Sequence, residues 1–300
     1  MEKGNLSLLY KSRSYGACIK AGYNLYTDNF RKLFKSTWII AAIIAIVEGL
    51  TKTLDTLHVA PVAVAVGIII EAICAVALFG TIIYIFNQHA VNDEITKVSL
   101  KKESKDILHD SIRVLKTIIW QLLLIMPIVA AYLFYAKMTT GHSLSDPYVH
   151  KYMIMLFFVF VICIILYMPF NYLIMKYCVG DKIHSWNVIT KGYKVGFRHW
   201  GFIFAVLFIT GIITAVVVLI VNTPHFVILG AKGLSDLGVM QGDPSGLPSY
   251  FSVLLFFVFA ITTFIGQYVE MAMLFPVYYM YGSIETQEKE KADFENNIQQ

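Results

Sequence analysis

Long runs of apolar residues, separated by short polar segments, dominate the chain. Six of these runs are long enough to cross a bilayer, which takes about 20 apolar residues for a hydrocarbon core of about 30 Å. The runs cover residues 37–57, 61–88, 117–135, 148–177, 201–221 and 249–281. They lack the strict alternation of barrel strands, so the pattern predicts an all-α integral membrane protein with six transmembrane helices.

Composition agrees with this prediction. Hydrophobic residues make up 57% of the 300 residues and charged residues only 15%, whereas soluble domains carry about 25% charged residues. The first 36 residues lack the apolar core of a cleavable signal peptide. None of the four cysteines falls in a predicted outside loop, so no disulfide framework is expected.

The distribution of positive charge predicts the orientation of the spans. Of the 24 Lys and Arg residues, 20 lie in the N-terminal segment, around 89–119, around 176–200, or in the C-terminal segment. Short loops rich in Lys and Arg stay on the cytoplasmic side of a membrane. Both termini are therefore expected in the cytoplasm, which agrees with an even number of spans.

The chain also reads as three copies of one unit within a single membrane domain. The predicted repeats are 1–90, 91–179 and 180–285, followed by a polar C-terminal tail at 286–300. Trp38, Trp120 and Trp200 stand at the expected cytoplasmic start of the odd-numbered spans, where a Trp ring serves as an interface anchor. Each even-numbered span opens near a proline and carries a helix-perturbing residue late in its sequence. The opening prolines are Pro61, Pro147 and Pro248, and the late residues are Gly80, Pro169 and Pro276.

The segment before each of these Trp residues has an apolar stripe at helical spacing. The stripes are Ile19, Tyr23, Tyr26, Phe30 and Leu33; Leu108, Ile112, Leu115 and Ile119; and Trp186, Ile189, Tyr193 and Phe197. Lys and Arg occupy the other faces, which predicts an interfacial amphipathic helix before each hairpin. Such helices either pack beneath the bundle or contact anionic lipid headgroups or a partner membrane protein, and the sequence leaves both readings open.

The string AGYNLYTDNFRKLFKSTWII at residues 21–40 resembles the opening of a loose group of bacterial six-helix membrane proteins of unknown function. That group includes the membrane domain attached to some glycerophosphodiester phosphodiesterases. The resemblance covers most of the chain as a pattern of amphipathic helix plus hairpin. It implies a fold and a bacterial inner (cytoplasmic) membrane, but no chemistry, because the phosphodiesterase domain has no counterpart here.

Charged residues inside the spans are the candidate functional residues, because burying a charge in a bilayer is costly. Glu48 lies ten residues after Trp38, and Glu71 lies ten residues after Pro61. Ten helical residues extend about 15 Å, so the two carboxylates are expected at similar depth in one hairpin. Lys52 follows Glu48 by four residues, a favourable helical pairing. The three residues form either an ion pair that fixes packing or an ion or proton site.

Gln267 and Glu270 are two further candidates in the last span. Aligning the repeats places Gln267 at the position that Glu71 holds in the first repeat. A polar side chain at one position in two repeats indicates either a central polar pathway or hydrogen bonding between helices.

Motifs for catalysis and metal binding are absent from the sequence. It contains no nucleophile elbow, zinc-protease motif, phosphate-binding loop or dinucleotide fingerprint. His142, Asp146 and His150 have metal-like spacing, but Asp146 followed by Pro147 is typical of a helix start instead. We therefore expect no enzyme activity, no cofactor, no metal and no nucleic-acid partner. The longest outside segment, 222–249, is predicted to be a surface loop, with a lid or docking loop as the alternative.

Two functions remain open from the sequence. The first is a non-catalytic scaffold or accessory subunit of a membrane process. The alternative is a transporter of small solutes or lipids that uses mid-membrane carboxylates. Carboxylates that surround one cavity would favour transport, whereas scattered carboxylates would favour the scaffold.

Overall fold

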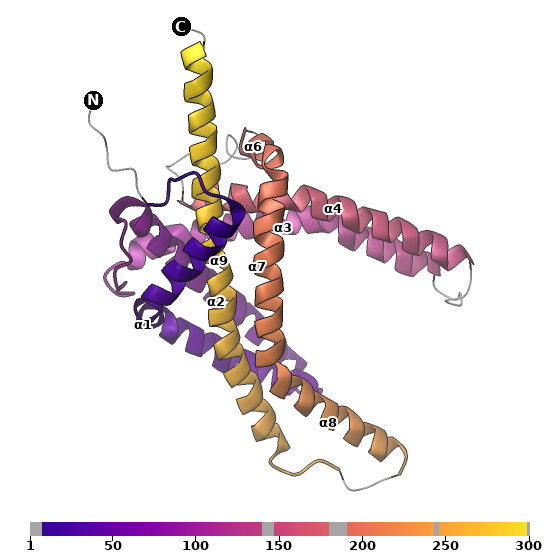
Figure 1. Ribbon diagram of the computed structural model, residues 1–300. Coiled ribbons are helices and arrows are strands. Elements are labelled where there is room, and N and C mark those ends of the chain that lie inside the picture. The colour runs from indigo at the N-terminus through magenta and orange to yellow at the C-terminus, as the bar shows by residue number, and fades with distance from the viewer. Residues whose placement is uncertain (1–7, 140–146, 180–190, 243–245, 299–300) are drawn as a thin grey trace.

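The computed structural model describes residues 8–139, 147–179, 191–242 and 246–298, and these residues form helices without any strand. Figure 1 shows their arrangement. The helices are α1 (Tyr15–Thr56), α2 (Pro61–Asn92), α3 (Ser104–Thr139), α4 (Pro147–Val179), α6 (Tyr193–Arg198), α7 (Trp200–Val221), α8 (Thr223–Met240) and α9 (Phe251–Ile298).

Six helices in the described part of the chain are long and apolar enough to cross a membrane: α1, α2, α3, α4, α7 and α9. Their positions match the six apolar runs of the sequence. The predicted fold class, an all-α protein with six transmembrane helices, is therefore confirmed. α2 and α4 begin at Pro61 and Pro147, as the proline positions predict. α9 begins at Phe251, three residues after Pro248.

The first two amphipathic segments are not separate helices. Each continues without interruption into the span that follows, as α1 and α3. The reason is local, because residues 23–48 and 104–126 contain neither Gly nor Pro, the two residues that most readily end a helix. Only the third segment is interrupted before its span, at His199 between α6 and α7.

Most of the buried apolar side chains lie near one end of the spans, where the second, fourth and sixth spans (α2, α4 and α9) meet. Phe86 of α2 stacks on Tyr278 of α9 with ring centroids 4.4 Å apart. Phe86 also makes an edge contact with Phe275 at 4.9 Å. Tyr172 of α4 lies against Tyr281 at 6.0 Å. These aromatic contacts join all three predicted repeats into one base.

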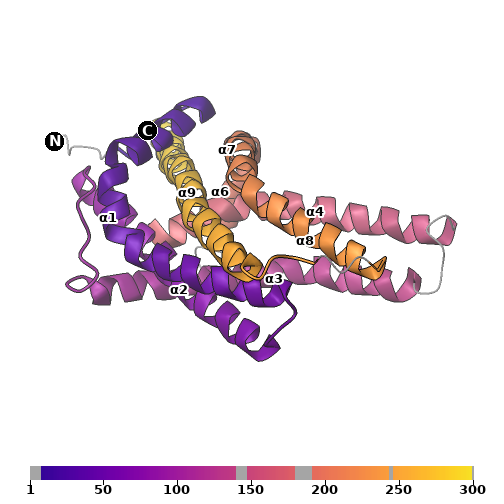
Figure 2. The ribbon, with the colours of Figure 1, turned by 90° about the horizontal axis from the view of Figure 1, so that it is seen from below.

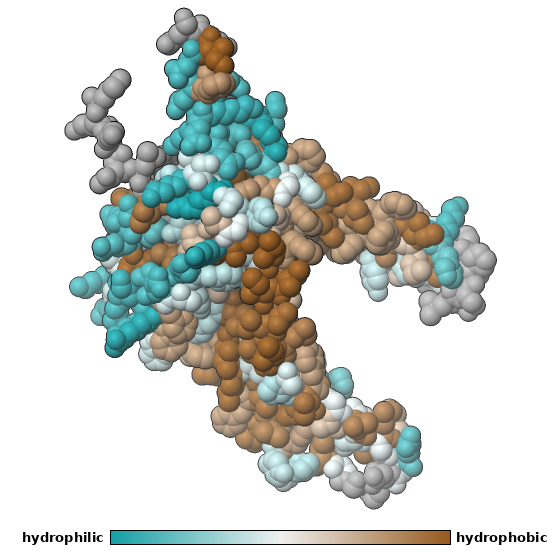
Figure 3. Space-filling view, viewed as in Figure 1, coloured by the Kyte–Doolittle hydropathy of each residue, from teal (hydrophilic) through white to brown (hydrophobic). Residues whose placement is uncertain are grey.

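Away from this base the helical hairpins separate. Figures 1 and 2 show the α3/α4 hairpin projecting to one side, while α7, α8 and α9 run in a different direction. In the most apolar stretch of α3, only 6% of the residues are buried inside the protein. The corresponding share is 11% for both α2 and α4. Figure 3 shows apolar surface along these arms and polar surface around the C-terminal part of α9. The spans therefore present most of their surface to their surroundings.

Three close helix contacts lie at the positions of the predicted helix perturbers. They pair Gly22 with Pro276, Ser111 with Gly80, and Gly196 with Pro169. In each pair one partner is a glycine whose missing side chain lets the two helices approach closely. Each contact joins the segment before an odd-numbered span to the perturber of an even-numbered span. The threefold repeat itself stays a prediction, and these contacts are consistent with it.

The segment after Val221 differs from the sequence-based expectation. Residues 223–240 form α8, so the prediction of a plain surface loop over 222–249 is wrong for this part. Asn222 and Pro224 do not end the helical region, because proline is tolerated in the first turn of a helix. Most apolar side chains of α8 are exposed, and Ile228 is buried against the outer part of α9.

Candidate functional site

The predicted charged residues of the first hairpin come together. Glu48 and Lys52 form an ion pair on α1, with 2.5 Å between the carboxylate Oε1 and the ammonium Nζ. The Lys52 side chain is 42% exposed and that of Glu48 is 21% exposed. The pair follows the helical spacing that the sequence indicates.

Glu71 of α2 lies within electrostatic range of both Glu48 and Lys52. Its Oε1 is buried and has no hydrogen-bond partner in the described part of the chain. The nearby Thr51 hydroxyl instead donates to the carbonyl of Val47 on its own helix at 2.8 Å. Lys52 therefore has Glu48 as its ion-pair partner, and Glu71 is left with an unpaired oxygen.

The last span contributes the remaining candidates less directly. Glu270 also interacts electrostatically with Glu48 and Lys52, although its side chain is exposed. Gln267 is partly buried and makes no side-chain hydrogen bond among the described residues. Glu48, Lys52 and Glu71 thus form a cluster, with Glu270 at its edge and Gln267 outside it.

One residue joins this cluster that the sequence reading did not single out. His225 of α8 packs against Phe259 of α9, with ring centroids 4.6 Å apart and the ring planes tilted by 45°. Burial lowers the pKa of the His225 imidazole, and the positive charge of Lys52 lowers it further, while Glu48 opposes that effect. No sequence signal could have placed His225 here, because the segment was expected to be a loop.

Four cavities in the described part of the chain have volumes between about 270 and 520 Å³, and none of those four is lined by Glu48, Glu71 or Glu270. The arrangement of the cluster is an ion pair with neighbouring carboxylates.

A second polar cluster joins α2, α3 and the end of α4, and the sequence reading missed it. Asn87 donates through Nδ2 to the buried Asp110 carboxylate at 3.0 Å and to the Cys178 carbonyl at 3.3 Å. Arg113 donates to the same carbonyl at 3.3 Å and lies 3.9 Å from Asp110. The spacing of Asp110 and Arg113 on one helix was visible in the sequence, but their partners on α2 and α4 were not.

Ion pairs also fasten the C-terminal part of α9 to its neighbours. Glu285 pairs with Lys176 of α4 at 2.7 Å. Glu288 accepts a hydrogen bond from Arg198 at 2.8 Å and lies 2.8 Å from His199. The predicted polar tail is helical as far as Ile298, and its first turns are held by these pairs.

The three predicted Trp anchors lie in different surroundings. Trp38 is 46% exposed, as expected of a ring at the membrane interface. Trp120 is partly buried against Phe170 and Tyr177. Trp200 donates from Nε1 to the Ile165 carbonyl of α4 at 3.1 Å. Trp120 and Trp200 therefore also contact the protein itself.

The apolar stripes of the first two amphipathic segments also differ from each other. On α1, Ile19 and Leu33 are buried against the rest of the protein. On α3, the stripe is exposed and the opposite side, with Ile107 and Val114, is buried. The exposed stripe residues are Leu108, Ile112, Leu115 and Ile119. In the third segment, Trp186 and Ile189 lie outside the described residues.

The remaining sequence-based expectations concern cysteines and metals. All four cysteines are free thiols. Among the described residues no group of three His, Cys, Asp or Glu side chains could hold a metal ion. His142 and Asp146 lie outside the described residues, so their part in the metal reading stays untested.

Fold and composition together define the class of this protein: it is a polytopic α-helical membrane protein with six candidate spans. Comparison with protein-family models, curated proteins and solved structures gave no match for the chain. The particular function therefore has to be argued from the chain's own residues.

Proposed function

We propose that the protein is a non-catalytic scaffold or accessory subunit of a membrane process, with both termini in the cytoplasm. The observation that carries this proposal is the exposed apolar stripe on the first turns of α3, from Leu108 to Ile119. Exposed apolar patches rimmed by polar residues mark contacts with proteins or membranes. Here the exposed Lys105 and Lys116 lie beside the stripe on the same segment.

The arrangement of the spans supports the same proposal. The hairpins are fastened at one base and leave their apolar faces uncovered. Between helices in a bilayer there is little hydrophobic driving force, so such faces accept lipid or another helix at similar free energy. A protein built this way holds neighbouring membrane components and needs no internal passage. The basic residues beside the stripe also favour anionic lipid headgroups as partners.

A photoreactive amino acid placed on α3 tests the scaffold. At Leu108 or Leu115, irradiation of cells is expected to give one discrete protein adduct. At the exposed Asp106, which lies on a different face of α3, the adduct should be absent. The substitution Ile112→Glu should remove the adduct at Leu108 without loss of the folded protein, since Ile112 is 45% exposed. Lipid adducts alone at every position would refute a protein partner for this stripe.

One observation favours the transporter as a second candidate. Glu71 carries a buried carboxylate oxygen without a hydrogen-bond partner among the described residues, in electrostatic range of Lys52 and Glu48. Unpaired ionisable groups inside membranes are costly and often belong to proton or ion pathways.

Proteoliposomes that contain a pH-sensitive dye distinguish the two candidates. Under an imposed membrane potential, a proton-coupled transporter should acidify the lumen faster than protein-free vesicles do. Glu71→Gln should abolish that difference, whereas Glu285→Gln, outside the cluster, should not. Equal rates with wild type, Glu71→Gln and empty vesicles would leave the scaffold as the supported function.

A further inference from the structure

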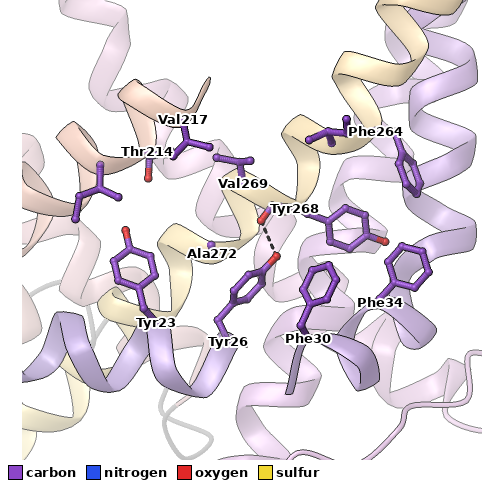
Figure 4. Close-up of a pocket in the computed structure, with 12 residues that line it drawn as sticks. Tyr23, Tyr26, Phe30, Phe34, Thr214, Val217, Phe264, Tyr268, Val269 and Ala272 are labelled. Atoms are coloured by element: carbon purple, nitrogen blue, oxygen red, sulfur yellow. Dashed lines mark hydrogen bonds between the residues drawn. The ribbon is translucent and has the colours of Figure 1, made fainter. Parts of the chain in front are cut away.

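An aromatic groove lies between α1, α7 and α9, and it has a volume of about 380 Å³. This volume lies within the usual range of small-molecule sites, about 300–1,000 Å³. Figure 4 shows its side chains. The aromatic residues of its wall are Tyr23, Tyr26, Phe30, Phe34, Phe264 and Tyr268. Several wall residues, including Phe30 and Ile265, are exposed, so the groove is open to the surroundings of the spans.

The length of the groove matches one leaflet of a bilayer. Along α9 its wall runs from Ala272 to Phe264, eight residues or about 12 Å of helix. The α1 residues of the wall, from Tyr23 to Phe34, precede the interface anchor Trp38, so they lie toward the headgroup end of the groove. Half of a hydrocarbon core of about 30 Å is about 15 Å. An extended hydrocarbon chain of one leaflet therefore fits along the groove.

One polar atom of the groove lacks a hydrogen bond of ordinary geometry. The hydroxyl of Tyr26 donates to the Tyr268 carbonyl at 2.9 Å, and the Tyr268 hydroxyl lies 3.4 Å from that of Thr37. The Tyr23 hydroxyl is buried and makes no hydrogen bond of ordinary geometry among the described residues, although it interacts with the Thr214 side chain. In Figure 4 it points toward Thr214 on α7, across one end of the groove. A buried hydroxyl in this position is suited to donate to a ligand oxygen, because it otherwise loses the hydrogen bond it had in water.

Positive charge lies at the same end of the groove. Lys20 is exposed and precedes Tyr23 by three residues, one helical turn away on α1. Lys11 and Arg13 come shortly before that helix in the chain. The groove thus has an apolar length, a hydrogen-bond donor at one end, and basic residues beyond the donor. This order of groups matches the acyl chain, the ester carbonyl and the anionic headgroup of a phospholipid.

We propose that this groove is a binding site for an anionic glycerophospholipid, with one acyl chain along the aromatic wall and an ester carbonyl on the Tyr23 hydroxyl. The site is independent of the scaffold or transporter role. The aromatic side chains offer the acyl chain a rigid apolar surface. They have few rotatable bonds, so little side-chain entropy is lost when the lipid binds.

The test uses the full-length protein in nanodiscs that contain phosphatidylethanolamine and the anionic lipid phosphatidylglycerol in a ratio of about 3:1. The probe is a phosphatidylglycerol that carries a diazirine near the carboxyl end of one acyl chain. After irradiation, peptides that contain residues 213–217 or 264–272 should carry several times more probe than the exposed face of α3 at 122–133. Equal labelling of the groove and of α3 would mean ordinary lipid contact and would overturn the proposal.

Substitutions make the test specific to the groove. Tyr23→Phe removes only the hydroxyl and should weaken labelling about fivefold, as expected for one lost hydrogen bond. The matched control is Tyr250→Phe, which removes the hydroxyl of an exposed tyrosine outside the groove and should leave labelling unchanged. Ala272→Phe and, on a different helix, Val217→Phe should each fill the groove and suppress labelling. Full labelling in Tyr23→Phe and in both filled variants would refute the site.

Competition identifies the class of lipid. Unlabelled phosphatidylglycerol should reduce labelling of the groove in proportion to its amount. Ether-linked phosphatidylglycerol at the same mole fraction should compete less well, because it has the same headgroup and chains but no ester carbonyl. Equal competition by the ether lipid would contradict the assignment of Tyr23 to an ester, and equal competition by phosphatidylcholine would contradict the preference for an anionic headgroup.

Discussion

At the scale of single residues, the charged cluster of the first hairpin depends on which carboxylate pairs with Lys52. Glu48 holds that position, with a 2.5 Å contact, while Glu71 keeps a buried oxygen without a hydrogen bond among the described residues. A carboxyl oxygen without a hydrogen bond adds little favourable interaction energy to the folded state. Glu71 therefore adds little to the stability of the folded protein, and Glu48 contributes more.

Substitution of each residue measures how much Glu48 and Glu71 contribute to the stability of the folded protein. Glu71→Gln should change the free energy of unfolding by less than about 0.5 kcal/mol, because Oε1 of Glu71 makes no hydrogen bond among the described residues that the substitution could remove. Glu48→Gln should lower it by up to about 1 kcal/mol, a modest figure because Lys52 is 42% exposed. Thermal unfolding of both variants in nanodiscs from pH 5 to 8 checks this. A larger loss in Glu71→Gln than in Glu48→Gln would show that Glu71 is the partner of Lys52.

The second polar cluster gives a stronger effect. Asn87→Ala removes a hydrogen bond to Asp110, which is only 5% exposed, and one to the Cys178 carbonyl. The Cys178 carbonyl keeps its hydrogen bond from Arg113, but the buried Asp110 carboxylate loses the one from Asn87. This loss should lower the free energy of unfolding by about 1–3 kcal/mol.

The matched control for Asn87 is Asn171→Ala. Asn171 donates only to carbonyls of its own helix, both at 3.4 Å. Asn171→Ala should lower the free energy of unfolding by less than about 1 kcal/mol. Equal destabilisation of the two variants would mean that the link between α2, α3 and α4 contributes nothing.

Whether the sequence predicts a contact depends on how far apart the two residues are along the chain. Glu48 and Lys52 are four residues apart on one helix, and helical spacing alone brings them together. The approach of Glu71 follows from equal depth in one hairpin. His225 and Asn87 were missed because their partners lie on helices distant in the chain, and no local pattern encodes those contacts.

At the scale of helices, the close approach of α1 to α9 depends on Gly22. A Cβ at this position would overlap the backbone of Pro276, which cannot turn aside as a flexible side chain can. Gly22→Ala should therefore lower the free energy of unfolding by about 1–3 kcal/mol.

Gly16 on the same helix is the control for Gly22, since no atom lies within 4 Å of a Cβ placed there. Gly16→Ala should be neutral or stabilising by up to about 1 kcal/mol, because alanine restricts the unfolded chain more than glycine does. Thermal unfolding of the two variants under identical conditions compares them directly. A stable Gly22→Ala protein with unchanged unfolding would show that α1 and α9 do not approach this closely.

The helices also show what periodicity can and cannot predict. Apolar spacing predicted the six spans, because length and hydropathy suffice for that. The same spacing on α1 and α3 could not tell which stripe is buried. In a membrane protein, a helix face is apolar both where it contacts lipid and where it packs against another helix. An apolar stripe therefore does not show which of the two it contacts.

At the scale of the whole molecule, the spans diverge from a shared base. The sequence predicted the number of spans but not this divergence, since nothing in the apolar pattern specifies which faces remain uncovered. The orientation of the molecule in the membrane stays a prediction from the distribution of Lys and Arg.

Labelling of single cysteines tests that orientation. In a variant without the four native cysteines, a membrane-impermeant maleimide should label Pro147→Cys and Gln241→Cys in intact cells. Ser104→Cys and Gln287→Cys should react only after the cells are opened, because positive loops face the cytoplasm. Labelling of Gln287→Cys but not Gln241→Cys in intact cells would invert the proposed topology.

The length of α9 has a mechanical consequence. A single helix of 48 residues, about 72 Å, joins one membrane surface to a polar rod on the other side. Its contact with Gly22 at Pro276 lies near the middle of that length and acts as a fulcrum. A helix tilts when the surrounding bilayer thins, and a tilt of about 10° moves a point 22 residues beyond the fulcrum by about 6 Å. The Lys176–Glu285 pair lies nine residues beyond the fulcrum, where the same tilt would move α9 by about 2 Å, and this ion pair would carry the movement to α4.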